Sequence, residues 1–198
     1  DRSEMETAAG IIKNGGLVGI PTETVYGLAG DALNPRSSER IYAAKGRPSD
    51  NPLIVHIADM DSLSYIVSEI PDTAKKLALE FWPGPLTMIM KKSERVPYET
   101  TGGLDTVAVR MPVNSIAMEF IRAAGGYIAA PSANTSGRPS CTTAEHVIED
   151  LNGKIEMIID GGPVGIGIES TIIDLTGNTP CLLRPGYINI EMLRKVLG

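Results

Sequence analysis

The residues between 21 and 52 include the side chains best suited to holding an anion. A Thr-Glu-Thr run at 22–24 opens the segment, and Lys45 and Arg47 follow in a stretch rich in glycine and proline. An arginine guanidinium binds two oxygens of a phosphate or carboxylate at once, and a lysine adds a mobile charge. The segment therefore predicts an anion site, although Lys45 and Arg47 would also suit a solvated helix end.

The Thr-Glu-Thr run directly follows a short apolar strand expected at 17–20. Strand carboxyl ends line the ligand crevice in open α/β sheets. Glu23 could there bind an ammonium group while Thr22 and Thr24 bind a carboxylate, so that the run would hold a zwitterion. The competing interpretation is a turn in which the threonine hydroxyls bond to the backbone.

Two later loops and one histidine complete the candidates. The loop at 131–140 gathers serine, threonine and asparagine after a strand, an arrangement that can direct hydroxyls and N–H groups at a nucleotide. It is neither a Walker A loop nor a nucleophile elbow, and it would equally suit an ordinary turn. A glycine-rich stretch at 160–171 leads into a strand, and Arg184 ends another strand. His56 lies in an apolar strand, and it could be either an ordinary core residue or a residue that binds a ligand.

Strands and helices that alternate without internal repeats must position these residues. Strands are expected at 17–20, 53–57, 86–90, 106–110, 127–130, 155–159, 171–175 and 181–184. Helices are expected after Ser3, at 35–44, near 59–67, at 71–81, at 114–124, from Thr142 or Thr143 to 151, and after Asn189. The alternation predicts an α/β fold with a mixed, mostly buried sheet.

Composition narrows the class of protein. The chain has 198 residues, of which 42% are hydrophobic, enough for a sizeable core. A net charge of −6 argues against a nucleic-acid coat protein. Cys141 and Cys181 lie far apart and outside any CxxC motif, which predicts reduced thiols in a cytoplasmic protein. There is no leader peptide and no apolar run of about 18 residues, so neither secretion nor membrane insertion is expected.

Eight sequence blocks occur together in a fixed order. They are PTETVYGL at 21–28, KGRP at 45–48, NPLIVHI at 51–57, WPGPLT at 82–87, VAVRMP at 107–112, SANTSGRPS at 132–140, IESTIIDL at 168–175 and LRPG at 183–186. In these blocks the chain resembles the Sua5/YrdC/YciO family, and most closely its threonylcarbamoyl-AMP synthase branch. The resemblance extends from about residue 16 to residue 186.

The resemblance implies a fold and a domain organisation. The expected fold is a YrdC-like α/β domain, in which a twisted, largely parallel mixed sheet flanked by helices encloses a deep basic cavity. Residues 1–198 would form a single catalytic domain of this kind. That domain would be either a natural single-domain protein or a part of a longer two-domain Sua5 protein.

The resemblance also implies an activity and a set of site residues. The family's synthases are nucleotidyltransferases that make L-threonylcarbamoyladenylate and pyrophosphate from L-threonine, bicarbonate and ATP, with Mg²⁺ expected as well. The motif tetrad around the reacting groups corresponds to Lys45, Arg47, Ser132 and Asn134. The threonine contacts correspond to Thr24, His56, Arg110, Ala130 and Ser170. The ATP contacts correspond to Arg47, Asn51, Thr106, Ser132, Ser140 and Arg184.

The implied partners follow from the same activity. A separate transferase complex would pass the threonylcarbamoyl group to the tRNA adenosine next to the anticodon, with at most weak direct tRNA binding by this chain. The alternative is a double-stranded RNA- or tRNA-binding relative without synthase activity. The acidic net charge and the lack of an evident aromatic stacking platform weaken that alternative.

Overall fold

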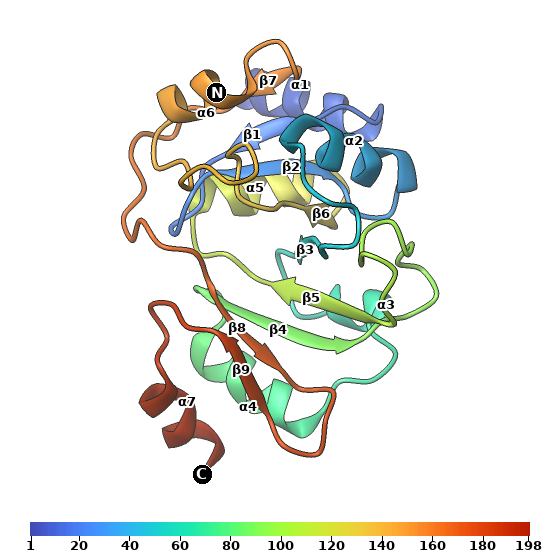
Figure 1. The fold of residues 1–198 in the computed structure, drawn as a ribbon, viewed down its shortest axis with the longest axis vertical. Coiled ribbons are helices and arrows are strands. Elements are labelled where there is room, and N and C mark those ends of the chain that lie inside the picture. The colour runs from blue at the N-terminus through green and yellow to red at the C-terminus, as the bar shows by residue number, and fades with distance from the viewer.

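The computed structural model describes all residues from Asp1 to Gly198, and its nine strands form one sheet flanked by helices (Figure 1). The strand order is β7-β1-β2-β6-β3-β5-β4-β8-β9. The strands are β1 (Val18–Ile20), β2 (Gly27–Asp31), β3 (Ile54–His56), β4 (Leu86–Lys91), β5 (Thr106–Arg110), β6 (Ile128–Ala129), β7 (Met157–Ile158), β8 (Thr171–Asp174) and β9 (Cys181–Arg184). The helices are α1 (Arg2–Lys13), α2 (Pro35–Lys45), α3 (Leu63–Ile66), α4 (Asp72–Phe81), α5 (Ser115–Ala123), α6 (Ala144–Leu151) and α7 (Ile190–Leu197).

The helix boundaries agree with the sequence expectations because the caps are local. Asn34, Asn114, Thr143 and Asn189 each accept a backbone N–H in the first turn of their helix. The first helix differs, since Asp1 rather than Ser3 is its N-cap.

The sheet is mixed, as expected, but it is not largely parallel. Only β7–β1, β3–β5 and β4–β8 are parallel, and the five other neighbouring pairs are antiparallel. The expectation of mostly parallel pairs is therefore wrong. The connections β1–β2 and β8–β9 are too short for the crossover that a parallel pair needs, so these neighbours return as antiparallel strands.

Strand β2 was not predicted, because its glycines look like turn signals. A Cβ on Gly30 would lie 3.0 Å from Ile41 Cδ1, and one on Gly27 would lie 3.2 Å from the Ala130 Cβ. These glycines therefore allow close packing of the strand on its neighbours.

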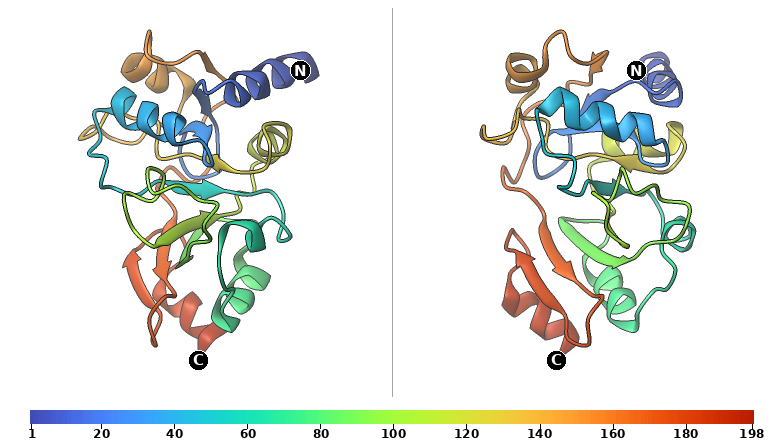
Figure 2. Two further views of the ribbon diagram at one scale, coloured as in Figure 1. Left: turned by 90° about the vertical axis from the view of Figure 1, so that its right-hand side faces the viewer. Right: turned by 45° about the vertical axis from the view of Figure 1, so that its right-hand side comes forward.

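Helices cover both faces of the sheet half formed by β1, β2 and β6. Figure 2 shows α2 on one side of this half and α1 and α5 on the other. The side chains of β1 and of the residue before it divide between these two faces. Val18 and Ile20 pack with Ile12 and Phe120, whereas Leu17, just before β1, joins the larger core on the other face.

Only one face of the other half, formed by β5, β4, β8 and β9, is covered by helices. Met88 and Met90 of β4 and Val107 and Val109 of β5 enter the core beneath α3, α4 and α7. The intervening residues must then point to the opposite face. That face borders the loops after α2 and β6, and it carries the candidate site.

Candidate active site

A cavity of about 530 Å³ lies on the face of β5, β4 and β8 that helices leave free. Its walls come from the strands, from the loop after α2 and from the segments around residues 24, 131 and 170. The lining side chains carry three cations, Arg47, Arg110 and Arg184, against a single carboxylate, Glu169. The expected basic character of the cavity is thus present in a chain whose net charge is negative.

Strand register builds the floor of this cavity. His56 pairs with Arg110, Arg110 with Thr87, Thr87 with Ile172, and Ile172 with Arg184. Partners in paired strands share a face of the sheet, so one row of side chains crosses five strands. Three residues that are far apart in the sequence, His56, Arg110 and Arg184, are brought together in this way.

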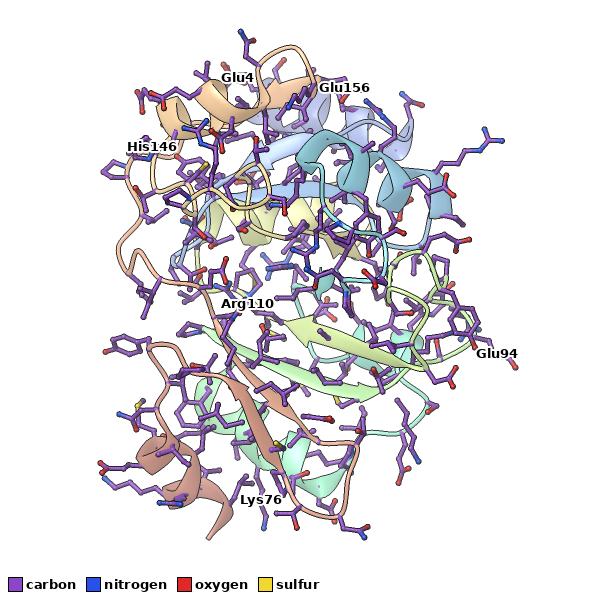
Figure 3. All side chains as sticks on the ribbon, viewed as in Figure 1. Glu4, Lys76, Glu94, Arg110, His146 and Glu156 are labelled. Atoms are coloured by element: carbon purple, nitrogen blue, oxygen red, sulfur yellow. The ribbon has the colours of Figure 1, made fainter.

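Arg110 lies at the centre of the molecule and is almost completely enclosed (Figure 3). It forms an ion pair with Glu23, donates a 2.9 Å hydrogen bond from Nη1 to Thr24 Oγ1, and donates from Nε to the Gly84 carbonyl oxygen. Burial and the nearby Arg184 lower the pKa of Arg110. The Glu23 carboxylate compensates the charge, and its other oxygen accepts two backbone N–H groups at the start of α5.

This arrangement corrects the expected role of Glu23. The carboxylate was expected to bind a substrate ammonium group, but it lies outside the cavity lining and faces Arg110. Thr22 is also used internally, since its hydroxyl donates to the Val25 carbonyl oxygen. Of the Thr-Glu-Thr run, only Thr24 reaches the cavity.

His56 lines the cavity as a neutral side chain. Burial lowers its pKa to about 4, so the imidazole carries no charge near pH 7. Its Nδ1 lies 3.2 Å from the Ile54 carbonyl oxygen, which assigns the proton to Nδ1. His56 is therefore suited to hydrogen bonding and shape recognition at the cavity, rather than to binding an anion by charge.

A more exposed part of the cavity carries Arg47 and Arg184. Arg184 forms a 2.6 Å ion pair with Glu169 and donates from Nε to the Ser170 carbonyl oxygen. Arg47 donates to the carbonyl oxygens of Asn51 and Pro52, which fixes the loop after α2. The side chains of Arg184 and Glu169 are each 35% exposed, so this part is open to solvent.

The structure brings most of the predicted site residues to the cavity. Nine of them line it: Thr24, Arg47, Asn51, His56, Arg110, Ala130, Ser132, Ser170 and Arg184. Lys45, Asn134, Thr106 and Ser140 do not line it. Ser140 donates to Glu169 Oε1 instead, and the Asn134 amide bonds within its own loop. The role of each residue toward a substrate stays a prediction.

Two residues at the site had no predicted role. Thr87 shares a 2.7 Å hydrogen bond with Ser170, and Glu169 bonds to both Arg184 and Ser140. The alternation of β4 was the available signal for Thr87, because Met88 and Met90 require the opposite face. Nothing local signals the partners of Glu169, which lies at the end of a glycine-rich loop.

The comparisons with known proteins agree with this fold. A family model described as "Telomere recombination", for Sua5, YciO and YrdC proteins, matches residues 10–186. The threonylcarbamoyl-AMP synthase of Pyrococcus abyssi is 57% identical over 195 residues, which are 98% of this chain and 57% of the relative. The crystal structure of P. abyssi Sua5 complexed with L-threonine is 56% identical with a TM-score of 0.98, over 100% of this chain and 58% of that one.

This chain therefore belongs to the Sua5/YciO/YrdC family. It spans somewhat more than half the length of the P. abyssi relative. By contrast, it covers 88% of a putative threonylcarbamoyl-AMP synthase of Mycobacterium tuberculosis, with 37% identity over 192 residues and 97% of this chain. None of the helices has the length and apolar character needed to cross a membrane.

Proposed function

We propose that this chain synthesises L-threonylcarbamoyladenylate from L-threonine, bicarbonate and ATP and releases pyrophosphate. The observation that carries the proposal is a single cavity lined by the enclosed Arg110 and Thr24 and also by the more exposed Arg47 and Arg184. The enclosed part suits the carboxylate of an amino acid, and the exposed part suits phosphate oxygens. A volume of about 530 Å³ is within the usual range of ligand sites.

The proposed chemistry needs positioning and charge stabilisation more than a protein nucleophile. The threonine amine takes up carbon from bicarbonate, and water leaves, to give a carbamate. A carbamate oxygen then forms a bond to the α-phosphorus while the bond to the pyrophosphate oxygen breaks. Because each reactant is anionic, Arg47 and Arg184 would reduce repulsion and stabilise the charge that develops on the phosphoryl group. Holding the reactants in one cavity supplies the orientation.

A divalent cation fits this proposal as a companion of ATP. No group of three or more histidine, cysteine or acidic side chains could form a metal site of its own. Mg²⁺ commonly binds through substrate phosphates and one or two carboxylates. Glu169, the one acidic residue on the cavity wall, would be the protein ligand, and the ion would supply further charge neutralisation at the phosphates.

The proposal extends to partners and context. We propose that the product passes to a tRNA-modifying transferase complex in the cytoplasm. Residues 1–198 would act as one catalytic domain. The support is the continuous nine-stranded sheet and the family membership.

Pyrophosphate release tests the activity directly. Release is expected only when L-threonine, bicarbonate and ATP are all present, and each is withheld in turn. Equal release without threonine would contradict the synthase. Calorimetric titration with threonine alone runs beside the assay, because binding at the enclosed part does not depend on turnover.

A further inference from the structure

Lys45 lies behind the cavity wall rather than on it. It is the last residue of α2, before Gly46 turns the chain with a φ of 62°, and it is only 2% exposed. It is absent from the residues that line the cavity, although Arg47, two residues later, is among them. A lysine buried this completely needs partners for its ammonium group.

Those partners belong to one loop, residues 131–140. The Nζ atom donates to the carbonyl oxygens of Ser132 and Asn134, the latter at 2.6 Å. The backbone carbonyl oxygen of Lys45 accepts a 2.8 Å hydrogen bond from the Ser136 N–H. Three bonds from a single residue therefore join the end of α2 to this loop.

The loop has little regular structure, and Asp150 of α6 holds its later part through Thr135 and Arg138. Its only strand-like pairing is an isolated bridge between Ser132 and Gly27. Hydrogen bonds from an ammonium group are about twice as strong as those between neutral groups. The ammonium of Lys45 thus binds the carbonyl of Ser132 from behind while the same residue lines the cavity in front.

We propose that Lys45 is a positioning residue, which holds the 131–140 loop so that Ser132 is presented to the cavity. The catalytic part of this role rests on the synthase function proposed above. The competing role is direct contact with a substrate through the third N–H of the ammonium group, which has no protein acceptor. The two roles predict different behaviour of the loop in the ligand-free protein.

Amide hydrogen exchange of the ligand-free protein separates the two roles. In Lys45→Met, exchange across residues 131–140 is expected to accelerate by at least about tenfold, since two charge-assisted bonds are lost. Lys76→Met, on the exposed face of α4, is the matched control and should leave exchange unchanged. Unchanged exchange in a folded Lys45→Met variant would overturn the proposal.

Lys45→Gln keeps the test valid if the methionine variant does not fold. Glutamine retains two N–H donors without a charge, so it can reach the two carbonyl oxygens in part. Loop exchange and pyrophosphate release should both recover toward wild type relative to Lys45→Met. If glutamine slows exchange but leaves turnover as low as methionine does, the charge itself acts on the substrate and the proposal fails.

A double-mutant cycle tests whether Lys45 acts through Ser132. Lys45→Met alone should reduce turnover roughly 100-fold, as expected when a preorganised site is lost. On the Ser132→Ala background the same change should cost no more than about threefold, because coupled residues are not additive. Full additivity of the two losses would contradict a role through Ser132.

The pH profile gives an independent readout. Burial and repulsion from Arg47 lower the pKa of Lys45 to about 8, while Glu169, Cys141 and Asp150 act in the opposite direction. Loop exchange in the wild type should therefore increase as the pH rises through about 8, beyond the ordinary pH dependence seen in Lys45→Gln. If the wild-type protein released no pyrophosphate, the proposed synthase function would be wrong. The exchange results would still decide whether Lys45 holds the loop.

Discussion

Arg110 and Arg184 line the same cavity but are held in different ways. The side chain of Arg110 is 4% exposed and has partners in Glu23, Thr24 and the Gly84 backbone. The side chain of Arg184 is 35% exposed and faces Glu169, which is equally exposed. Water therefore screens the second ion pair much more than the first.

The difference suits two kinds of ligand. A buried arginine held by several protein partners has a fixed orientation, and its remaining N–H groups can hold a small group such as an amino-acid carboxylate with little reorganisation. An open part of the cavity with a separable ion pair can admit a larger polyanion and let a product leave. Under the proposed function, selectivity for the amino acid would reside at Arg110, while the phosphates of ATP would meet Arg47 and Arg184.

The largest expected effect separates the two ion pairs by stability. Arg110→Met leaves the Glu23 carboxylate buried without its partner and should lower the free energy of unfolding by about 3–5 kcal/mol. Arg184→Met removes a half-exposed pair and should cost no more than about 1 kcal/mol. Urea unfolding of both variants measures the two losses of unfolding free energy. Equal losses would show that the two ion pairs do not differ in their contribution to stability.

The open part of the cavity should show the reverse pattern, with a loss of rate rather than stability. Arg47→Ala should reduce pyrophosphate release about 10²–10³-fold, because one preorganised charge contact is lost. Arg36→Ala, at an exposed position near the start of α2, is the control. Turnover near wild type in Arg47→Ala would show that Arg47 acts only as a solvated cation near the end of a helix.

Acid should destabilise the enclosed part of the cavity through His56. Burial lowers the pKa of His56 to about 4, so the folded state keeps it neutral while the unfolded chain takes up a proton below about 6.5. Stability should therefore fall from pH 6.5 toward 4, by up to about 3 kcal/mol from this group. His56→Phe should lose this component, measured by urea unfolding across that range, whereas His146→Asn at an exposed site should keep it. An unchanged profile in His56→Phe would show that His56 is not the group responsible.

The smallest effect concerns the choice of amino acid. Serine lacks only the methyl group of threonine, a difference worth about 1–3 kcal/mol, or roughly 10–200-fold. Valine keeps the shape but leaves a polar partner unpaired if Ser170 or Thr24 bonds the threonine hydroxyl, so it should perform worse than serine. Competition of both analogues in the pyrophosphate assay measures the order. A better result with valine would mean that the cavity reads shape alone.

The sequence by itself determined most of the elements and the composition of the site. Caps such as Asn34 and Asn114 act within three residues, and the apolar runs of β4 and β5 are visible in the sequence. Such signals are local, which is why every expected helix and eight of the nine strands could be placed. The blocks that carried the family resemblance also include eight of the nine predicted residues that line the cavity, all except Ala130.

Only the tertiary structure decided which groups meet. Arg110 meets Glu23 across 87 positions of the chain, and Lys45 meets the 131–140 loop from the far end of α2. From the sequence, Glu23 and Lys45 were predicted to act on a substrate. In the folded chain their charged groups contact other parts of the protein instead. Pairings over such separations depend on strand order and register, which no short stretch of sequence encodes. For the same reason the antiparallel majority of the sheet and the close packing of β2 became visible only in the folded chain.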